Sequence, residues 1–186
     1  MNMDTNYLYY GDNLDILRRY VKDETVDLIY LDPPFNSNAT YNVLFAERNG
    51  SQSAAQIKAF GDTWHWDEVA AAAFHEVVEA GGKVSQAMQA FRTLLGDKND
   101  MLAYLGMMAP RLVELRRVLK PTGSIYLHCD PTASHYLKVL MDAVFSTKYF
   151  RNEIIWMRTI SKSLMTRRLP SNHDVLLCFQ RSEQST

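Results

Sequence analysis

The strongest constraint on the fold is the segment VDLIYLD, residues 26–32, which ends abruptly at Pro33 and Pro34. It is apolar at most positions, a pattern typical of a parallel strand that is covered on both faces. Proline cannot donate to a sheet ladder, so the pair predicts where the strand ends. A short aromatic strand at 7–10 and a helical pattern over 13–21 precede it. Together these segments predict a βαβ unit in an α/β fold.

The remaining sequence continues the α/β alternation after one stretch of different composition. Ala, Gln, Glu and Lys become frequent after about residue 47, and helical runs predict an inserted helical region over 48–99. A long helical pattern then runs over 100–119, where the KPTG segment predicts its end. A strand, a helix and two further strands are predicted at 124–130, 131–145, 152–157 and 173–180. We therefore expect residues 1–47 and 100–181 to form one α/β domain, which the insertion interrupts.

Composition narrows the class of protein without naming an activity. A hydrophobic fraction of 47% fits a globular domain, and a formal charge of −1 predicts no general attraction to nucleic acid. No segment approaches the roughly 20 apolar residues that span a bilayer, and the N-terminus carries no leader, so we expect a cytoplasmic protein. Cys129 and Cys178 lie in apolar runs without CxxC spacing, which predicts buried thiols in a reducing compartment.

The most informative chemistry lies in the string Asp32-Pro33-Pro34-Phe35, at the carboxyl end of the predicted strand, where ligands gather in open α/β sheets. The prolines fix the backbone and leave the Asp32 carboxylate and the Pro33 carbonyl as two acceptors that suit one NH2 group. Accepting both amine protons turns the nitrogen lone pair toward an incoming methyl group. Phe35 offers a ring on which a flipped base can stack. A strand-ending turn with Phe35 in the core remains the alternative.

These residues carry a resemblance to a known family. The string LDPPFNS, preceded by YGDNLDIL, resembles the amino-directed DNA methyltransferases that use S-adenosyl-L-methionine (AdoMet), whose hallmark is a D/N/S-P-P-Y/F tetrapeptide. Later segments resemble the permuted β-type group, in which the catalytic region precedes the cofactor region. The similarity covers residues 5–47 and 99–181. It implies part of a Rossmann-like AdoMet-dependent methyltransferase sheet that acts on double-stranded DNA.

The resemblance also assigns roles to individual residues. It implies that Asp32 and the Pro33 carbonyl hold the target amine, next to Pro34, and that Phe35 stacks on the base, although Tyr is commoner there. Asp12 would lie beside the adenine of AdoMet, with the capping of a turn as the alternative.

Two further residues at a strand end are candidates for the same pocket. His128 and Asp130 end the strand 124–130, so they are predicted to line the cofactor pocket together with Asp12 and Asp32. For Asp130, which precedes Pro131, capping the next helix is the alternative.

Basic and aromatic residues outside the tetrapeptide suggest contacts with DNA. The connection 158–172 offers Arg158, Lys162, Arg167 and Arg168 as a phosphate-contacting strip, with a solvated loop as the alternative. In the insertion, Trp64 and Trp66 could contact bases or neighbouring DNA, but packing is the favoured interpretation. None of the histidines has a ligand spacing such as HExxH, so no metal site is predicted.

The sequence contains no FxGxG-like turn after a strand, which the resemblance leads us to expect at the AdoMet site. In the sheet of the family that this sequence resembles, strands that have no counterpart here lie between those that correspond to residues 7–10 and 26–32. We therefore expect the chain alone to be inactive and to need a second chain or further segment. Aspartate at position 32 favours adenine N6, by the resemblance alone, over cytosine N4.

Three other interpretations of the sequence stay open or are disfavoured. Cytosine C5 chemistry is disfavoured because neither Cys129 nor Cys178 has the setting of a nucleophile. A non-catalytic, split DNA-binding half remains an alternative. The same amine chemistry on RNA also stays open, whereas Asp32 disfavours a protein amide, for which related enzymes carry Asn.

Overall fold

The computed structural model describes residues 6–34, 64–158 and 172–184 of the 186-residue chain. The helices of this part are α1 (Asn13–Tyr20), α2 (Glu68–Ala80), α3 (Gly82–Leu95), α4 (Asp100–Val118), α5 (Ser134–Phe145) and the short 3-10 helix η1 (Thr147–Tyr149). Its strands are β1 (Val26–Leu31), β2 (Leu119–Cys129), β3 (Phe150–Met157) and β4 (His173–Gln180). The α/β class expected from the sequence is confirmed. Within the predicted helical insertion, the described residues 64–99 form α2 and α3.

Side chains that precede the helices account for where three of them start. Asp12 accepts a hydrogen bond from the Leu14 amide at 2.8 Å and so caps α1. Asp67 caps α2 and Asn99 caps α4 in the same way. Each cap satisfies an amide that has no partner within its own helix. Pro110 lies inside α4, which continues through it to Val118.

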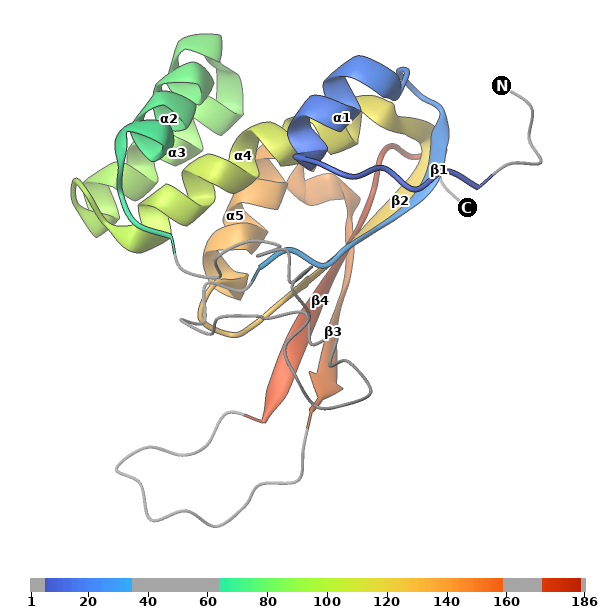
Figure 1. The fold of residues 1–186 in the computed structure, drawn as a ribbon. Helices are drawn as coiled ribbons and strands as arrows, with labels where there is room; N and C mark the ends of the chain where they lie inside the picture. Colours follow the sequence, from blue (N-terminus) through green and yellow to red (C-terminus); the bar gives the residue numbers. More distant parts are fainter. Residues whose placement is uncertain (1–5, 35–63, 159–171, 185–186) are drawn as a thin grey trace, which may run out of the picture.

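The four strands form one mixed sheet in the order β1-β2-β4-β3. β1 is parallel to β2, whereas β4 is antiparallel to both β2 and β3. Figure 1 shows the helices gathered on one side of this sheet, with α4 and α5 lying nearest to it. The carboxyl ends of β1 and β2 therefore lie at the same edge of the sheet.

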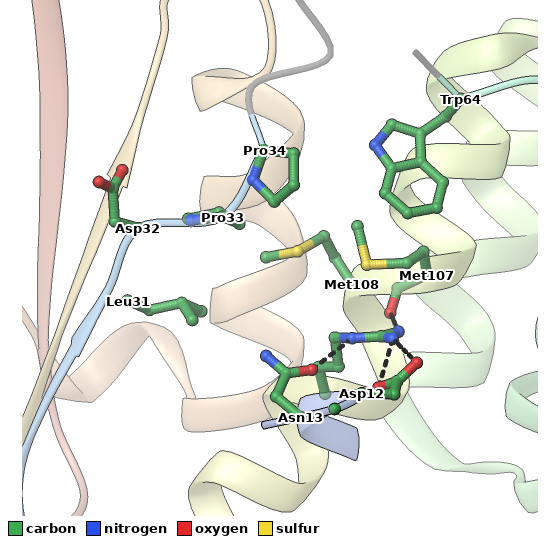
Figure 2. A pocket seen from close by; sticks show the side chains of 11 residues that line it. Asp12, Asn13, Leu31, Asp32, Pro33, Pro34, Trp64, Met107 and Met108 are labelled. Carbon is green, nitrogen blue, oxygen red and sulfur yellow. Dashed lines mark hydrogen bonds and ion pairs between the residues drawn. The ribbon is translucent and has the colours of Figure 1, made fainter. Parts of the chain in front are cut away.

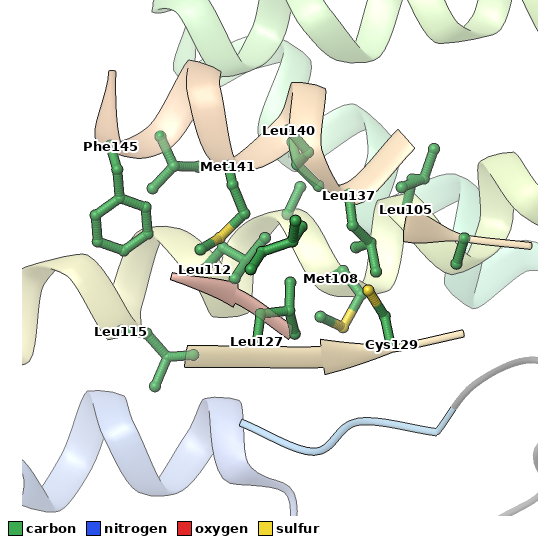
Figure 3. Packing of buried hydrophobic residues seen from close by; sticks show 14 of the residues in the cluster. Leu105, Met108, Leu112, Leu115, Leu127, Cys129, Leu137, Leu140, Met141 and Phe145 are labelled. Atoms are coloured by element: carbon green, nitrogen blue, oxygen red, sulfur yellow. The ribbon is translucent and has the colours of Figure 1, made fainter. Parts of the chain in front are cut away.

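The core lies between the helix-covered face of the sheet and helices α4 and α5 (Figure 3). Alternate residues of the strands point into it, and the side chains of α4 and α5 fill the space from the other side. Figure 3 labels members of this cluster from α4, β2 and α5: Leu105, Met108, Leu112, Leu115, Leu127, Cys129, Leu137, Leu140, Met141 and Phe145. Burial of so many large side chains fixes the sheet relative to these helices.

The opposite face of the sheet exposes several apolar side chains. The exposed fractions are 60% for Leu28 and 59% for Tyr30 on β1, and 42% for Ile154 and 59% for Trp156 on β3. The expectation that residues 26–32 form a strand covered on both faces is therefore wrong for this chain. β1 is also an edge strand of the sheet that the described residues form, so only one neighbour supports it.

Two predicted element boundaries are also corrected. Residues 7–10 form no strand, and Leu8 is 98% exposed, because among the described residues nothing pairs with them. The KPTG segment 120–123 belongs to β2, not to a turn between helix and strand. It lies where the β1–β2 register shifts, between the pairs Val26–Leu119 and Leu28–Ser124.

None of the helices in the described ranges 6–34, 64–158 and 172–184 is long and apolar enough to cross a bilayer.

Candidate active site

A cleft of about 440 Å³ opens beyond the carboxyl end of β1. This volume lies within the range of about 300–1,000 Å³ that is usual for small-molecule sites. Its walls come from the residues before and within α1, from the end of β1, from the middle of α4 and from Trp64 (Figure 2). The lining residues are Gly11, Asp12, Asn13, Leu31, Asp32, Pro33, Pro34, Trp64, Met107, Met108 and Arg111.

Asp32 lies at the rim of this cleft, directly after β1. Figure 2 shows its carboxylate turned away from Met108, whereas Leu31 and Pro33 point toward that side chain. The carboxylate is 60% exposed, and its Oδ1 lies 3.2 Å from Nδ1 of His128 on β2. Pro33 is buried. The predicted acceptor is therefore accessible to solvent and held on one side by an imidazole.

His128 lies between Asp32 and Asp174, a buried carboxylate on the neighbouring strand β4. Its Nε2 lies 3.4 Å from Oδ2 of Asp174, whose side chain is only 4% exposed. The other oxygen of Asp174 lies 3.2 Å from Nε of Arg158. A buried carboxylate is costly unless it is paired, and here the guanidinium of Arg158 and the imidazole of His128 flank it. These residues link the ends of all four strands.

Asp12 lies across the cleft from Asp32 and is bound by Arg111 of α4. The Arg111 Nη2 atom lies 2.8 Å from both carboxylate oxygens of Asp12, and Nε donates to Asn13 at 2.8 Å. Nη1 donates to the Met107 carbonyl at 2.7 Å. Since Asp12 also caps α1, this cluster fixes the start of α1 against α4. Asp12 therefore has the capping role that was given as the alternative, and it also lines the cleft.

Gly11 forms the backbone wall beside Asp12. Its φ of +141° lies in a region that residues with a Cβ atom rarely adopt. Glycine here allows the chain to turn from residues 7–10 into α1 while it borders the cleft.

The two tryptophans of the insertion have different positions. Trp66 packs edge-on against Phe74, with ring centroids 5.7 Å apart, which confirms the packing interpretation for this residue. Trp64 lines the cleft, and Figure 2 shows it on the far side of the opening from Pro34. Its ring also lies 6.4 Å from that of Tyr104. Trp64 therefore packs against the core residue Tyr104 and also lines the cleft.

The other strand-end residues lie outside the lining of the cleft. Oδ1 of Asp130 accepts a hydrogen bond from the Ala133 amide at 3.1 Å, so Asp130 supports the turn into α5. Cys129 and Cys178 are buried and unpaired with each other. Burial raises the pKa of the Cys129 thiol to about 12, so this thiol stays protonated at neutral pH and is a poor nucleophile.

The structure thus brings several predicted residues together and separates others. Asp12, Asp32, Pro33 and Pro34 line one cleft, and His128 contacts Asp32 from beside it. Arg158 pairs with Asp174. The remaining predicted residues, Phe35, Lys162, Arg167 and Arg168, lie outside the described residues.

Sequence reasoning missed two charged residues, Arg111 and Asp174. Both contact a candidate site residue through a pairing distant in the sequence, and neither belongs to a motif that would have marked it. Within the described residues, no group of three or more His, Cys, Asp or Glu side chains could hold a metal ion.

The lining fits one part of an AdoMet molecule. Pro34 and Trp64 border the cleft with apolar surfaces that suit a flat ring, whereas the Asp32 carboxylate is turned away from Met108. Arg111 already engages both oxygens of Asp12. Among the described glycines, Gly11 lies before α1 without a preceding strand, Gly81 follows α2 and Gly82 begins α3. The described lining therefore offers apolar surfaces to a ring but no glycine-rich turn after a strand.

Comparison with known proteins identifies relatives among enzymes of restriction and modification. The chain is 28% identical over 181 residues to the Mod subunit of the type III restriction-modification enzyme StyLTI of Salmonella typhimurium (strain LT2), covering 96% of this chain and 24% of that protein. It is 23% identical to the type II methyltransferase M.KpnI of Klebsiella pneumoniae, covering 100% of this chain and 34% of that protein. The chain thus spans about a quarter to a third of these relatives.

Solved structures with similar folds include TTHA0409 of Thermus thermophilus, with 12% identity and a TM-score of 0.47 over 95% of this chain and 53% of that one. The PvuII DNA methyltransferase, which is cytosine-N4-specific, matches with 15% identity and a TM-score of 0.41 over 95% and 49% of the two chains.

The N6/N4 DNA methylase family model matches residues 26–186, which include β1, the Asp32-Pro33-Pro34 segment and every later strand. Since this match covers most of the sequence, the chain belongs to the DNA methylase family.

Proposed function

We propose that this chain carries the base-holding part of a DNA methyltransferase that transfers a methyl group from AdoMet to adenine N6. The observation that carries the proposal is the Asp32-Pro33-Pro34 segment, which borders a cleft beyond the carboxyl end of β1 in a member of the DNA methylase family. Ligands of α/β sheets bind at this edge.

The proposed chemistry depends on how Asp32 and Pro33 hold an exocyclic amine. The carboxylate of Asp32 and the carbonyl of Pro33 each accept one N–H of the amine, which turns its lone pair away from the ring plane. As methyl transfer proceeds, the nitrogen gains a bond and must lose one proton, which these acceptors already face. AdoMet, when bound, would supply the electrophilic methyl group. Asp12 would border its adenine, and Asp32 its reacting end.

The target base must flip out of the DNA duplex to enter this cleft, because a base that is stacked within the duplex cannot reach it. Phe35 is proposed to stack on one face of the flipped base. Trp64, on the opposite side of the opening from Pro34, offers a second apolar surface. Arg158, Lys162, Arg167 and Arg168 are proposed to contact the phosphates of double-stranded DNA.

The direct test of the site is Asp32→Ala in the protein as its gene encodes it. Alanine removes the side-chain acceptor for the amine N–H, so methyl transfer should fall by about 100-fold or more, which is the usual cost of losing a group that stabilises the reacting centre. Incorporation of labelled methyl groups into mixed-sequence plasmid DNA measures the rate. The matched control is Asp27→Ala, because Asp27 lies on the same strand and pairs with Lys120 instead. Full activity in Asp32→Ala would refute the proposed site.

The choice between adenine and cytosine requires a product measurement. Both bases present an exocyclic NH2, and the acceptor pair suits either one. The aspartate at position 32 supports adenine by family resemblance. Mass spectrometry of nucleosides from methylated DNA should show N6-methyladenine, whereas N4-methylcytosine alone would reject this choice.

We also propose that a second polypeptide segment or chain completes the cofactor site. Support comes from the absence of a Gly-rich turn after a strand in the sequence, and from the exposed apolar face of the sheet. A DNA-binding half without activity of its own is the second candidate function, favoured by the same exposed face. Methyl transfer by the completed protein would exclude it.

A further inference from the structure

Three successive contacts connect the candidate acceptor Asp32 to His128, to the buried carboxylate of Asp174 and to Arg158. His128 lies 3.2 Å from Asp32 and 3.4 Å from Asp174, and Arg158 lies 3.2 Å from the other oxygen of Asp174. The exposed fraction of the side chains falls from 60% at Asp32 to 17% at His128 and 4% at Asp174. An accessible carboxylate is thus anchored to a buried one through a single imidazole.

The sheet register explains why these side chains meet. Tyr30 pairs with Tyr126 on β2, so the following alternate residues, Asp32 and His128, project from the same face. His128 pairs with Leu176, and Asp174 is the next residue of β4 on that face. The three residues therefore form a row across three strands, and its geometry is set by backbone pairing.

The imidazole between two carboxylates has a defined orientation. Nδ1 lies 3.2 Å from Asp32, and Nε2 lies 3.4 Å from Asp174 at an ion-pair distance, so turning the ring over would move both nitrogens away from these carboxylates. With its proton on Nδ1, the imidazole donates to Oδ1 of Asp32. Among the described residues, no partner of Oδ2 is recorded, so this oxygen remains for a substrate N–H.

We infer that His128 and Asp174 are positioning residues for Asp32. His128 fixes one carboxylate oxygen so that the other accepts from the target amine, and Asp174, paired with Arg158, holds the imidazole in place. This inference rests on the proposed function, because Asp32 must be the amine acceptor for its orientation to affect the reaction. Precise placement of a reacting group contributes strongly to rate, since a shift of about 1 Å can cost about 100-fold.

The test compares His128→Ala and His128→Gln in the protein as its gene encodes it. The alanine variant should lower kcat for methyl transfer into plasmid DNA by about 10- to 100-fold, while KM for DNA and AdoMet stays within about twofold. Glutamine can still donate to Asp32 and should restore part of the loss. The matched control is His135→Ala, since His135 is exposed on α5. Unchanged kcat in the folded alanine variant would overturn the inference.

A double-mutant cycle with Asp32→Ala separates positioning from a purely structural role. If His128 acts through Asp32, its removal should cost little more once Asp32 is changed, whereas independent effects should multiply. Circular dichroism and melting temperature are measured for each variant, and a rate loss that follows only the folded fraction would contradict the inference.

Asp174→Asn provides a second variant that leaves both residues of the Asp32–His128 contact in place. We expect a smaller fall in kcat and a change in the imidazole nitrogen chemical shifts of His128, measured by NMR. Unchanged shifts would contradict the link between Asp174 and the ring. Loss of activity in Asp32→Ala, with wild-type kinetics in the His128 and Asp174 variants, would reject the inference and leave the proposed function standing. Activity retained in Asp32→Ala would reject the proposed function itself.

Discussion

The two carboxylates of the cleft, Asp12 and Asp32, have basic partners with different physical properties. Arg111 lies 2.8 Å from both oxygens of Asp12, and its guanidinium is always charged. His128 lies near one oxygen of Asp32, and an imidazole presents a single ring nitrogen on that side. The Asp12 contact therefore fastens helix α1 to α4, whereas the Asp32 contact leaves an acceptor for a ligand.

Trp64 and Trp66 should respond differently to replacement by alanine. Trp64→Ala removes one side of the opening opposite Pro34, so it should weaken binding of the target base by about 1–3 kcal/mol, seen as a higher KM for DNA. Trp66→Ala is the matched control, because Trp66 packs against Phe74 and should lower the melting temperature without a specific rise in KM. An unchanged KM in Trp64→Ala would exclude Trp64 from the base site.

Cys129 should make folding stability depend on pH at the alkaline end. Burial raises the pKa of its thiol from 9.0 to about 12, so the folded chain holds this proton more tightly than the unfolded chain. The stabilising effect is complete below about pH 9 and decreases as the pH rises toward 12. From pH 8 to pH 10 the free energy of unfolding should fall by about 1 kcal/mol more than in Cys129→Ala, measured with urea. Equal slopes would contradict this assignment.

At the scale of elements, the strands that the sequence marks most clearly are those with local signals. β4 was expected at 173–180 and occupies these residues, because its apolar run is bounded by polar residues on both sides. The end of β1 was located by Pro33 and Pro34. Local composition suffices here because each signal lies within the element or directly beside it.

Elements that depend on distant partners were placed less well. The aromatic run at 7–10 has strand-like composition, but a strand also needs a neighbour for its amide and carbonyl groups. The proline and glycine of KPTG suggested a turn, yet pairing with β1 keeps 119–129 in one strand around a register shift. Likewise, no local pattern marks Arg111 or Asp174, because each meets its partner only when distant helices and strands pack together.

Gly123, in this irregular part of β2, should tolerate no larger side chain. A Cβ atom there would lie 2.8 Å from the Asp27 carbonyl oxygen and 2.7 Å from a methyl carbon of Leu119. Because one of these contacts is with backbone, β1 and β2 would have to separate. Gly123→Ala should lower the free energy of unfolding by about 1–3 kcal/mol. Thr122→Ala, at the exposed neighbouring position, is the control and should stay within about 0.5 kcal/mol. Equal melting temperatures of the two variants would contradict the close approach.

At the scale of the whole molecule, one face of the sheet is packed and the other exposes apolar side chains. Helices α4 and α5 cover the face that carries Leu127 and Cys129, whereas Leu28, Tyr30 and Trp156 project from the other with more than half of their surface exposed. The exposed residues of β1 and β3 lie at opposite edges of the sheet, and exposed apolar surface favours association with another polypeptide. The sequence marks β1 as apolar at most positions, but its pattern does not show that Leu28 and Tyr30 are exposed.

The AdoMet affinity of these 186 residues on their own tests the proposal that a second segment completes the cofactor site. Among the described residues, Arg111 engages the Asp12 carboxylate at the cleft, and the sequence has no Gly-rich turn after a strand. If the proposed second segment supplies the backbone amides that hold the amino-acid end of AdoMet, these residues alone should bind AdoMet weakly. Isothermal titration calorimetry should give a dissociation constant above about 100 µM, or less than about 5.5 kcal/mol of binding. Circular dichroism must first show that the chain is folded. A one-site isotherm in the low micromolar range would mean that these residues already form the whole cofactor site, and the proposed need for a second segment would then be wrong.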